Sequence, residues 1–282
     1  MTTITNYVQA ASIEMALQAL ADNKMSGRFL AGGTSLMPIL NLLRYQPGVT
    51  HTLIDIKHIE GLRTIELQAD ELVIGAAVTL SELTKHQLVL EHAPVLVRIA
   101  KVIGSREIRN RATLGGNLCS GDPRADLLLP AMALLARLQF VHMDDPNVMG
   151  MSEFLAQGNR ARQHAILTHI YIPIAKEVRW GYSRLAEKSM GRCNIAAMAF
   201  VAGESGSLKE IGLVVGGEAL WPQYFTGLHI GSGAKGLILT LAEKVVSEIA
   251  AGKVGWSDYR TATAVTVVYE ALEELMNNEA NA

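Results

Sequence analysis

The spacing of hydrophobic residues in the first part of the chain changes repeatedly between the helical and the strand period. After Ser12, a residue type that suits a helix N-cap, Ile13, Leu17 and Leu20 recur at the spacing of one helix face. The elements predicted next are a strand at 28–31, a helix at 36–43 and a strand at 52–56. This alternation of helix and strand predicts an α/β layer.

The same alternation continues through the middle of the chain. Thr79 and Glu82 have the spacing of a capping box and follow an apolar strand pattern at 71–78, so a helix should begin there. In the stretch 165–174 every second residue suits one buried face, as in a half-buried strand. Two further helices are predicted, at 94–102 and 130–138.

The pattern changes beyond residue 176, where strand patterns follow one another without intervening helices. Antiparallel strands are predicted within 182–188, 194–204 and 210–220, with a turn at 203–206 between the last two. Helices near 235–250 and 257–277 close the chain. We therefore expect one domain at 1–176 and a C-terminal α+β domain at 177–282.

Composition narrows the classes of function. An apolar share of 49% and a charged share of 18% fit a compact globular protein. A net charge of −2 and 5% aromatic residues argue against a nucleic-acid partner. The longest strongly apolar run, 127–136, is about half the length of a membrane-spanning helix, and the N-terminus lacks a secretory pattern. Cys119 and Cys193 are too few for a disulfide framework, so we expect a cytoplasmic protein without a membrane span.

Several motifs carry little weight. The segment GSGAKG at 231–236 matches a dinucleotide pattern, but no convincing strand precedes it, and a loop before a helix explains it better. The eight histidines show no metal-binding spacing, and no residue stands out as catalytic. Arg106, Arg109 and Arg111 form a basic group that suits a solvated face, a subunit contact or an anion site.

Two Gly-Gly turns carry more weight. Gly32-Gly33 is followed by Thr34 and Ser35, and Gly115-Gly116 lies between Thr113 and Asn117. Successive backbone N–H groups at such a turn can hold a phosphate, and glycine has no Cβ that would keep the ligand away. A plain tight turn explains either pair alone, but two such turns could hold a pyrophosphate from both sides.

The segments LAGGTSL and IRNRATLGGNLCSGDPRADLLLP closely resemble the two signature segments of the FAD-binding medium subunit of molybdenum hydroxylases, the family of carbon monoxide dehydrogenase and xanthine dehydrogenase flavoproteins. The resemblance covers nearly the whole chain. It implies that both glycine loops bind the FAD pyrophosphate. The loop residues implied are Leu30, Ala31, Gly32, Gly33, Thr34, Ser35, Leu36, Thr113, Leu114, Gly115, Gly116 and Asn117.

The resemblance implies four further cofactor contacts, at Asp126, Leu167, Tyr182 and Arg184. Asp126 matches an aspartate that contacts the cofactor, and Leu167 matches a position beside the flavin. Tyr182 and Arg184 resemble the Tyr-x-Lys start of a strand that approaches the isoalloxazine ring. The chain departs from the family pattern at Arg184, which replaces a lysine, and at Asn194, where an acid is common.

The resemblance also implies the fold and the partners. The expected α+β fold has an FAD-binding region in two subdomains, divided near residue 56, before the C-terminal antiparallel sheet with its helices. A molybdenum-cofactor large subunit would oxidise the substrate, a small subunit with [2Fe-2S] clusters would relay electrons, and FAD on this chain would pass them to NAD, a quinone or oxygen. The complex would be a heterotrimer or its dimer. Two alternatives stay open: a free-standing FAD oxidoreductase and a flavin-free assembly or binding protein.

Overall fold

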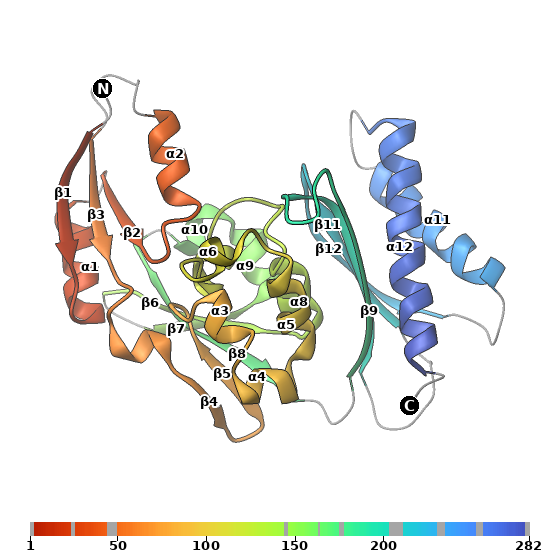
Figure 1. Cartoon of the computed structure of the whole chain (residues 1–282), viewed down its shortest axis with the longest axis horizontal. Helices are drawn as coiled ribbons and strands as arrows, with labels where there is room; N and C mark the ends of the chain where they lie inside the picture. The colour runs from red at the N-terminus through yellow and green to blue at the C-terminus, as the bar shows by residue number, and fades with distance from the viewer. Residues whose placement is uncertain are drawn as a thin grey trace. The chain divides into compact units, whose positions relative to one another are not determined.

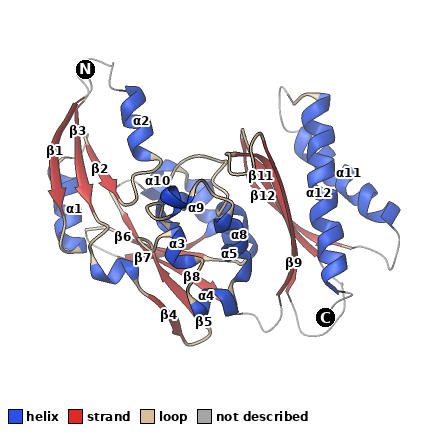
Figure 2. Ribbon diagram, in the orientation of Figure 1, coloured by secondary structure: helices blue, strands red, loops and turns tan. Residues whose placement is uncertain are grey.

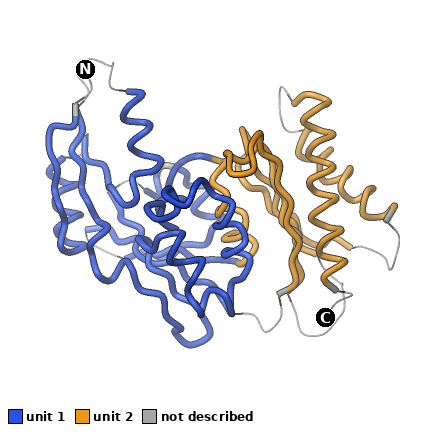
Figure 3. Tube along the Cα trace, in the orientation of Figure 1, with its two compact units in different colours: residues 1–122, 135–174 blue, residues 123–134, 175–282 orange. Residues whose placement is uncertain are grey.

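The computed structural model describes residues 3–23, 26–43, 50–143, 146–162, 164–174, 178–202, 211–229, 235–251 and 256–279. The chain forms two compact units, coloured separately in Figure 3. Unit 1 contains residues 1–122 and 135–174, and unit 2 contains residues 123–134 and 175–282. The short segment 123–134 thus packs with the C-terminal part of the chain, although it lies within the expected 1–176 domain. The division into functional domains stays a prediction.

Unit 1 begins with a three-stranded parallel sheet of order β1-β3-β2 (Figure 1). Its strands are β1 (Thr3–Gln9), β2 (Gly27–Leu30) and β3 (Thr50–Asp55), with helices α1 (Ile13–Asp22) and α2 (Leu36–Leu43). Ser12 caps α1 by accepting a hydrogen bond from the Met15 N–H, as predicted. Leu17 and Leu20 of α1 pack against Ile54 of β3, so the helix covers one face of the sheet.

A buried carboxylate lies at the carboxyl end of β3. The Asp55 side chain is 0% exposed, contacts the Lys57 ammonium at 2.8 Å and accepts a hydrogen bond from the Tyr7 hydroxyl. Burial raises the pKa of Asp55, but the hydrogen bonds from Lys57 and Tyr7 outweigh it and hold the pKa below its ordinary value. The ionised carboxylate therefore stabilises the end of the sheet where β2 passes into the first glycine loop.

The lowered pKa of Asp55 predicts that the stability of the protein depends on pH. Because the pKa is lower in the folded state, the stabilisation by Asp55 is present above the unfolded pKa of about 4 and is lost as the pH falls through the folded value. Asp55→Asn should lower the free energy of unfolding by about 2 kcal/mol near pH 7, and by less below about pH 4. Urea unfolding at a series of pH values measures the difference. A difference that grows on acidification would contradict this assignment.

The rest of unit 1 contains a five-stranded antiparallel sheet of order β4-β5-β8-β6-β7. The strands are β4 (Ile65–Gln68), β5 (Glu71–Gly75), β6 (Arg137–Val141), β7 (Pro146–Gly150) and β8 (Ile166–Pro173). Short helical segments accompany it (Figure 2): η1 (Glu60–Arg63), α3 (Leu80–Leu83), α4 (Gln87–His92), α5 (Pro94–Lys101), α6 (Arg106–Arg109), α7 (Leu114–Leu118), α9 (Met151–Gln157) and α10 (Asn159–Arg162). The predicted capping box at Thr79 and Glu82 begins α3.

Unit 2 is built on a four-stranded antiparallel sheet of order β12-β11-β10-β9. Its elements are α8 (Leu128–Ala133), β9 (Val178–Ala186), β10 (Cys193–Ala202), β11 (Ile211–Gly217), β12 (Leu220–Leu228), α11 (Lys235–Ala251) and α12 (Asp258–Glu279). Ala197 and Ala199 of β10 share a core with Val246 of α11 and Leu272 of α12. Helix α8 packs against β10, β11 and β12. The predicted antiparallel sheet with helices is therefore confirmed.

Two sequence-based expectations need correction. The predicted helix at 130–138 is wrong at its end, because α8 stops at Ala133 and β6 begins at Arg137, with Leu135 at φ +53° between them. The segment before 231–236 does contain a strand, β12, which ends at Leu228, although the sequence there is poor for one and its pairing with β11 has irregularities. The predicted turn at 203–206 and most of the 231–236 motif lie outside the described residues. Within the described ranges, no helix is long and apolar enough to cross a membrane.

Candidate flavin site

The first Gly-Gly loop joins β2 to α2 in unit 1. Gly33 has φ +73°, a conformation that favours glycine, and its carbonyl accepts the Met37 N–H at 3.0 Å as the first hydrogen bond of α2. The backbone N–H groups of residues 32–36 donate to no other described residue. A run of available donors where the chain passes from a left-handed glycine into a helix is a concave anion-binding arrangement.

The second Gly-Gly loop forms the start of α7 and has a different geometry. Thr113 caps the helix by accepting the Gly116 N–H at 3.0 Å, and its carbonyl accepts the Asn117 N–H at 2.9 Å. The Leu114 and Gly115 N–H groups donate to carbonyls of residues 78 and 76, each at 2.9 Å. This loop therefore differs from the expected cradle of available N–H groups. The part of this loop that a ligand can approach is the backbone of Gly116, which is exposed and carries no side chain.

The glycines of the two loops allow close approach of the backbone to neighbouring segments. A Cβ at Gly32 would lie 2.0 Å from the Arg111 carbonyl oxygen, and a Cβ at Gly115 would lie 2.6 Å from the Ala76 Cβ. The Arg111 side chain reaches back, and its Nε donates to the Gly32 carbonyl at 3.4 Å. The structure thus brings together the two glycine loops, which are far apart in the sequence.

Leu167 also belongs to unit 1. It lies in β8, pairs with Phe140 of β6 and is 7% exposed. Its side chain forms part of the packed sheet, so its place beside a flavin stays a prediction.

The other three predicted positions, Asp126, Tyr182 and Arg184, belong to unit 2. Arg184 Nε lies 3.1 Å from Asp126 Oδ1, and both side chains are nearly buried, with 11% and 7% of their surface exposed. Arg184 also donates to the carbonyls of Ser189 at 3.0 Å and Gly191 at 2.7 Å, so it holds the turn between β9 and β10. The Tyr182 side chain is 6% exposed, and its backbone N–H donates to Glu274 at 2.9 Å.

A buried thiol adjoins this ion pair. The pKa of Cys193 is raised to about 12, chiefly by burial and also by the Asp126 charge, while Arg184 opposes the shift. The thiol is 3% exposed, so it serves packing and not nucleophilic chemistry.

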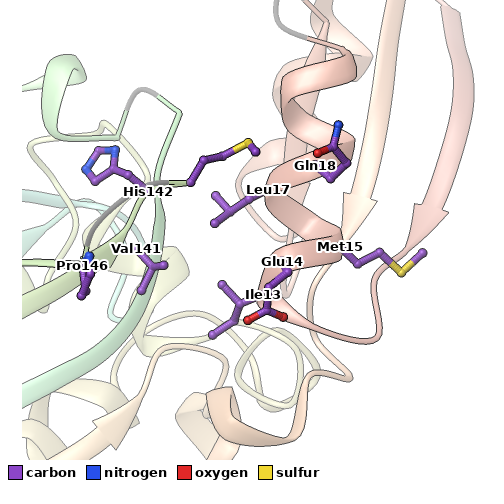
Figure 4. A pocket seen from close by; sticks show the side chains of 9 residues that line it. Ile13, Glu14, Met15, Leu17, Gln18, Val141, His142 and Pro146 are labelled. Atoms are coloured by element: carbon purple, nitrogen blue, oxygen red, sulfur yellow. The ribbon is translucent and has the colours of Figure 1, made fainter.

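A surface recess of about 650 Å³ lies elsewhere in unit 1, between α1 and the end of β6 (Figure 4). Apolar side chains dominate its lining, which includes Ile13, Leu17, Val141 and Met143. None of the predicted cofactor positions contributes to its lining.

The sequence missed two interactions of these sites, the Arg111 contact with Gly32 and the ion pair of Arg184 with Asp126. Each joins residues that are distant in sequence, and no local pattern encodes such a contact. The sequence does show the basic group at 106–111, but its spacing is compatible with a solvated face, a subunit contact or an anion site.

Comparison with known proteins shows the family of this chain. The family described as "FAD binding domain in molybdopterin dehydrogenase" matches residues 3–175. The chain is 31% identical over 209 residues to the carbon monoxide dehydrogenase medium chain of Hydrogenophaga pseudoflava, covering 71% of this chain and 70% of that one. It is 33% identical over 150 residues to the alpha subunit of the 6-hydroxypseudooxynicotine dehydrogenase complex of Paenarthrobacter nicotinovorans, and this match spans 53% of this chain and half of that subunit.

The fold also matches a solved structure. A chain of carbon monoxide dehydrogenase from Hydrogenophaga pseudoflava superposes with a TM-score of 0.85 at 23% identity, covering 98% of this chain and 99% of that one. The fold is of the α+β type, and the family match shows that the chain is an FAD-binding protein. The chain belongs to the family of FAD-binding domains of molybdopterin dehydrogenases, whose members include oxidoreductase subunits. The predicted family, fold class and FAD cofactor are confirmed.

Proposed function

We propose that the first glycine loop holds the FAD pyrophosphate through its backbone N–H groups and that the second loop lies against it at Gly116. The donors of residues 32–36 carry this proposal, since they donate to no described residue and surround a left-handed glycine. Asn117, Asp126, Leu167, Tyr182 and Arg184 are proposed as further contacts. FAD supplies one- and two-electron chemistry when bound, while the chain binds and orients it.

We further propose that the chain is the electron-transfer subunit of a molybdenum hydroxylase. Electrons would reach the flavin from [2Fe-2S] clusters of a small subunit, after substrate oxidation on a molybdenum-cofactor subunit, and would leave to NAD, a quinone or oxygen. The family membership and the names of the relatives as subunits and medium chains support this role. The two cysteines of the chain are too few to ligate a cluster of its own.

A visible absorption spectrum of the purified full chain tests the cofactor. We expect bound, noncovalent FAD that dithionite reduces and that acid releases into the supernatant. A chain that neither retains FAD nor binds it in titration would contradict the proposed site.

Purification from the native source tests the role. Iron and molybdenum should co-purify with the chain, and the chain alone should not oxidise purines, aldehydes or aromatic heterocycles. Recovery of a fully active, metal-free flavoenzyme would favour a free-standing oxidoreductase instead.

A further inference from the structure

Arg111 lies beside the first glycine loop and has an exposed side chain. Its Nε donates to the Gly32 carbonyl at 3.4 Å, which ties the guanidinium to the loop that presents the available N–H groups. Within the described ranges, no carboxylate forms an ion pair with Arg111. Its charge and its two terminal nitrogens therefore stay available for a ligand.

The neighbouring cations of the basic group differ from Arg111. Arg109 donates through Nη1 to the Gly104 carbonyl at 2.6 Å and so holds the turn before α6. Within the described ranges, Arg106 lies on α6 and contacts neither glycine loop. Of the three arginines, Arg111 alone contacts a glycine loop through an interaction that the structure describes.

We propose that Arg111 is a binding residue for the diphosphate of FAD, with Nε anchored on Gly32 and the terminal nitrogens directed at phosphate oxygens. This inference rests on the proposed function of the first loop. Backbone N–H groups are neutral and supply hydrogen bonds without net charge, whereas a diphosphate is an anion. The guanidinium adds a fixed positive charge, and its planar fork matches the geometry of phosphate oxygens.

The alternative to this role is a purely structural one, in which Arg111 joins the two loops without contacting the diphosphate. The two roles differ in their response to salt. A charge that contacts phosphate makes FAD binding weaken as ionic strength rises, whereas a guanidinium that only joins the loops and does not contact the phosphate does so much less.

The experiment compares Arg111→Gln, Arg111→Lys and the control Arg106→Gln in the full chain. FAD is removed, and its Kd is measured by titration of flavin fluorescence at low and high NaCl. Arg111→Gln should raise the Kd about 10- to 100-fold, the range expected for losing hydrogen bonds between charged groups. It should also flatten the salt dependence. Arg111→Lys should give an intermediate Kd with the salt dependence kept, and Arg106→Gln should bind as the wild type does.

Three results would overturn the proposal: a Kd for Arg111→Gln within twofold of the wild type, a weaker Kd with an unchanged salt dependence, or an equal loss in Arg106→Gln. Circular dichroism and thermal unfolding show whether each variant is folded, and Arg111→Lys gives the answer if Arg111→Gln is not. If the proposed function itself is wrong, the wild-type chain will bind no FAD in the same titration.

Discussion

Gly32→Ala is expected to weaken FAD binding about 100-fold, the equivalent of losing two hydrogen bonds to a charged group. The added Cβ would lie 2.0 Å from the Arg111 carbonyl oxygen and 2.7 Å from its carbon. Both atoms belong to the backbone, so no side-chain rotation relieves the contact and the two loops must separate. The N–H groups of residues 32–36 then lose the position in which they would face the diphosphate.

The measurement is the Kd of FAD for the full chain, together with the free energy of unfolding. Steric overlap of this kind costs about 1–3 kcal/mol of stability, so the variant should still be folded. Gly61→Ala is the matched control, since a Cβ at Gly61 has no neighbour within 4 Å. A Gly32→Ala chain that binds FAD as tightly as Gly61→Ala would show that the first loop is not the diphosphate site.

Two strands of the parallel sheet and the helix after Ser12 could be predicted because their signals are local, whereas β1 was not predicted. The helical spacing after Ser12 agrees with α1, and the strands predicted at 28–31 and 52–56 agree with β2 and β3. The structure of the stretch 130–138 could not be predicted, because nearly all of its residues are apolar. Such a stretch has no periodicity that would distinguish a buried helix from a strand. The chain changes element there through Leu135, whose positive φ is unusual for a leucine.

The candidate site could be predicted in part, because a glycine pair is also a local signal in the sequence. A glycine pair signals close approach of a backbone, and both pairs do lie against another segment of the chain. The sequence could not show which N–H groups are available. Those of Leu114 and Gly115 donate to the carbonyls of residues 78 and 76, which follow β5, and this contact depends on tertiary structure.

The second large effect is expected at the buried ion pair of unit 2. Asp126→Asn keeps the shape of the side chain but removes the charge that faces Arg184 at 3.1 Å. Both side chains are nearly buried, so the guanidinium would be left without its counter-charge in a poorly solvated place. Breaking a buried pair in this way costs about 3–5 kcal/mol. Because Arg184 also holds the Ser189 and Gly191 carbonyls, the turn between β9 and β10 should loosen as well.

Urea unfolding and labelling of the Cys193 thiol measure this effect on unit 2. The native thiol is buried and its pKa is raised to about 12, so a thiol reagent at pH 8 should label it only after opening of the unit. Labelling should be faster in Asp126→Asn. Glu218→Gln is the control, since it breaks an ion pair with Arg260 whose side chains are 46% and 33% exposed, and it should change stability by less than about 1 kcal/mol. Equal stability and equal labelling rates in the two variants would show that the pair of Asp126 and Arg184 does not stabilise unit 2.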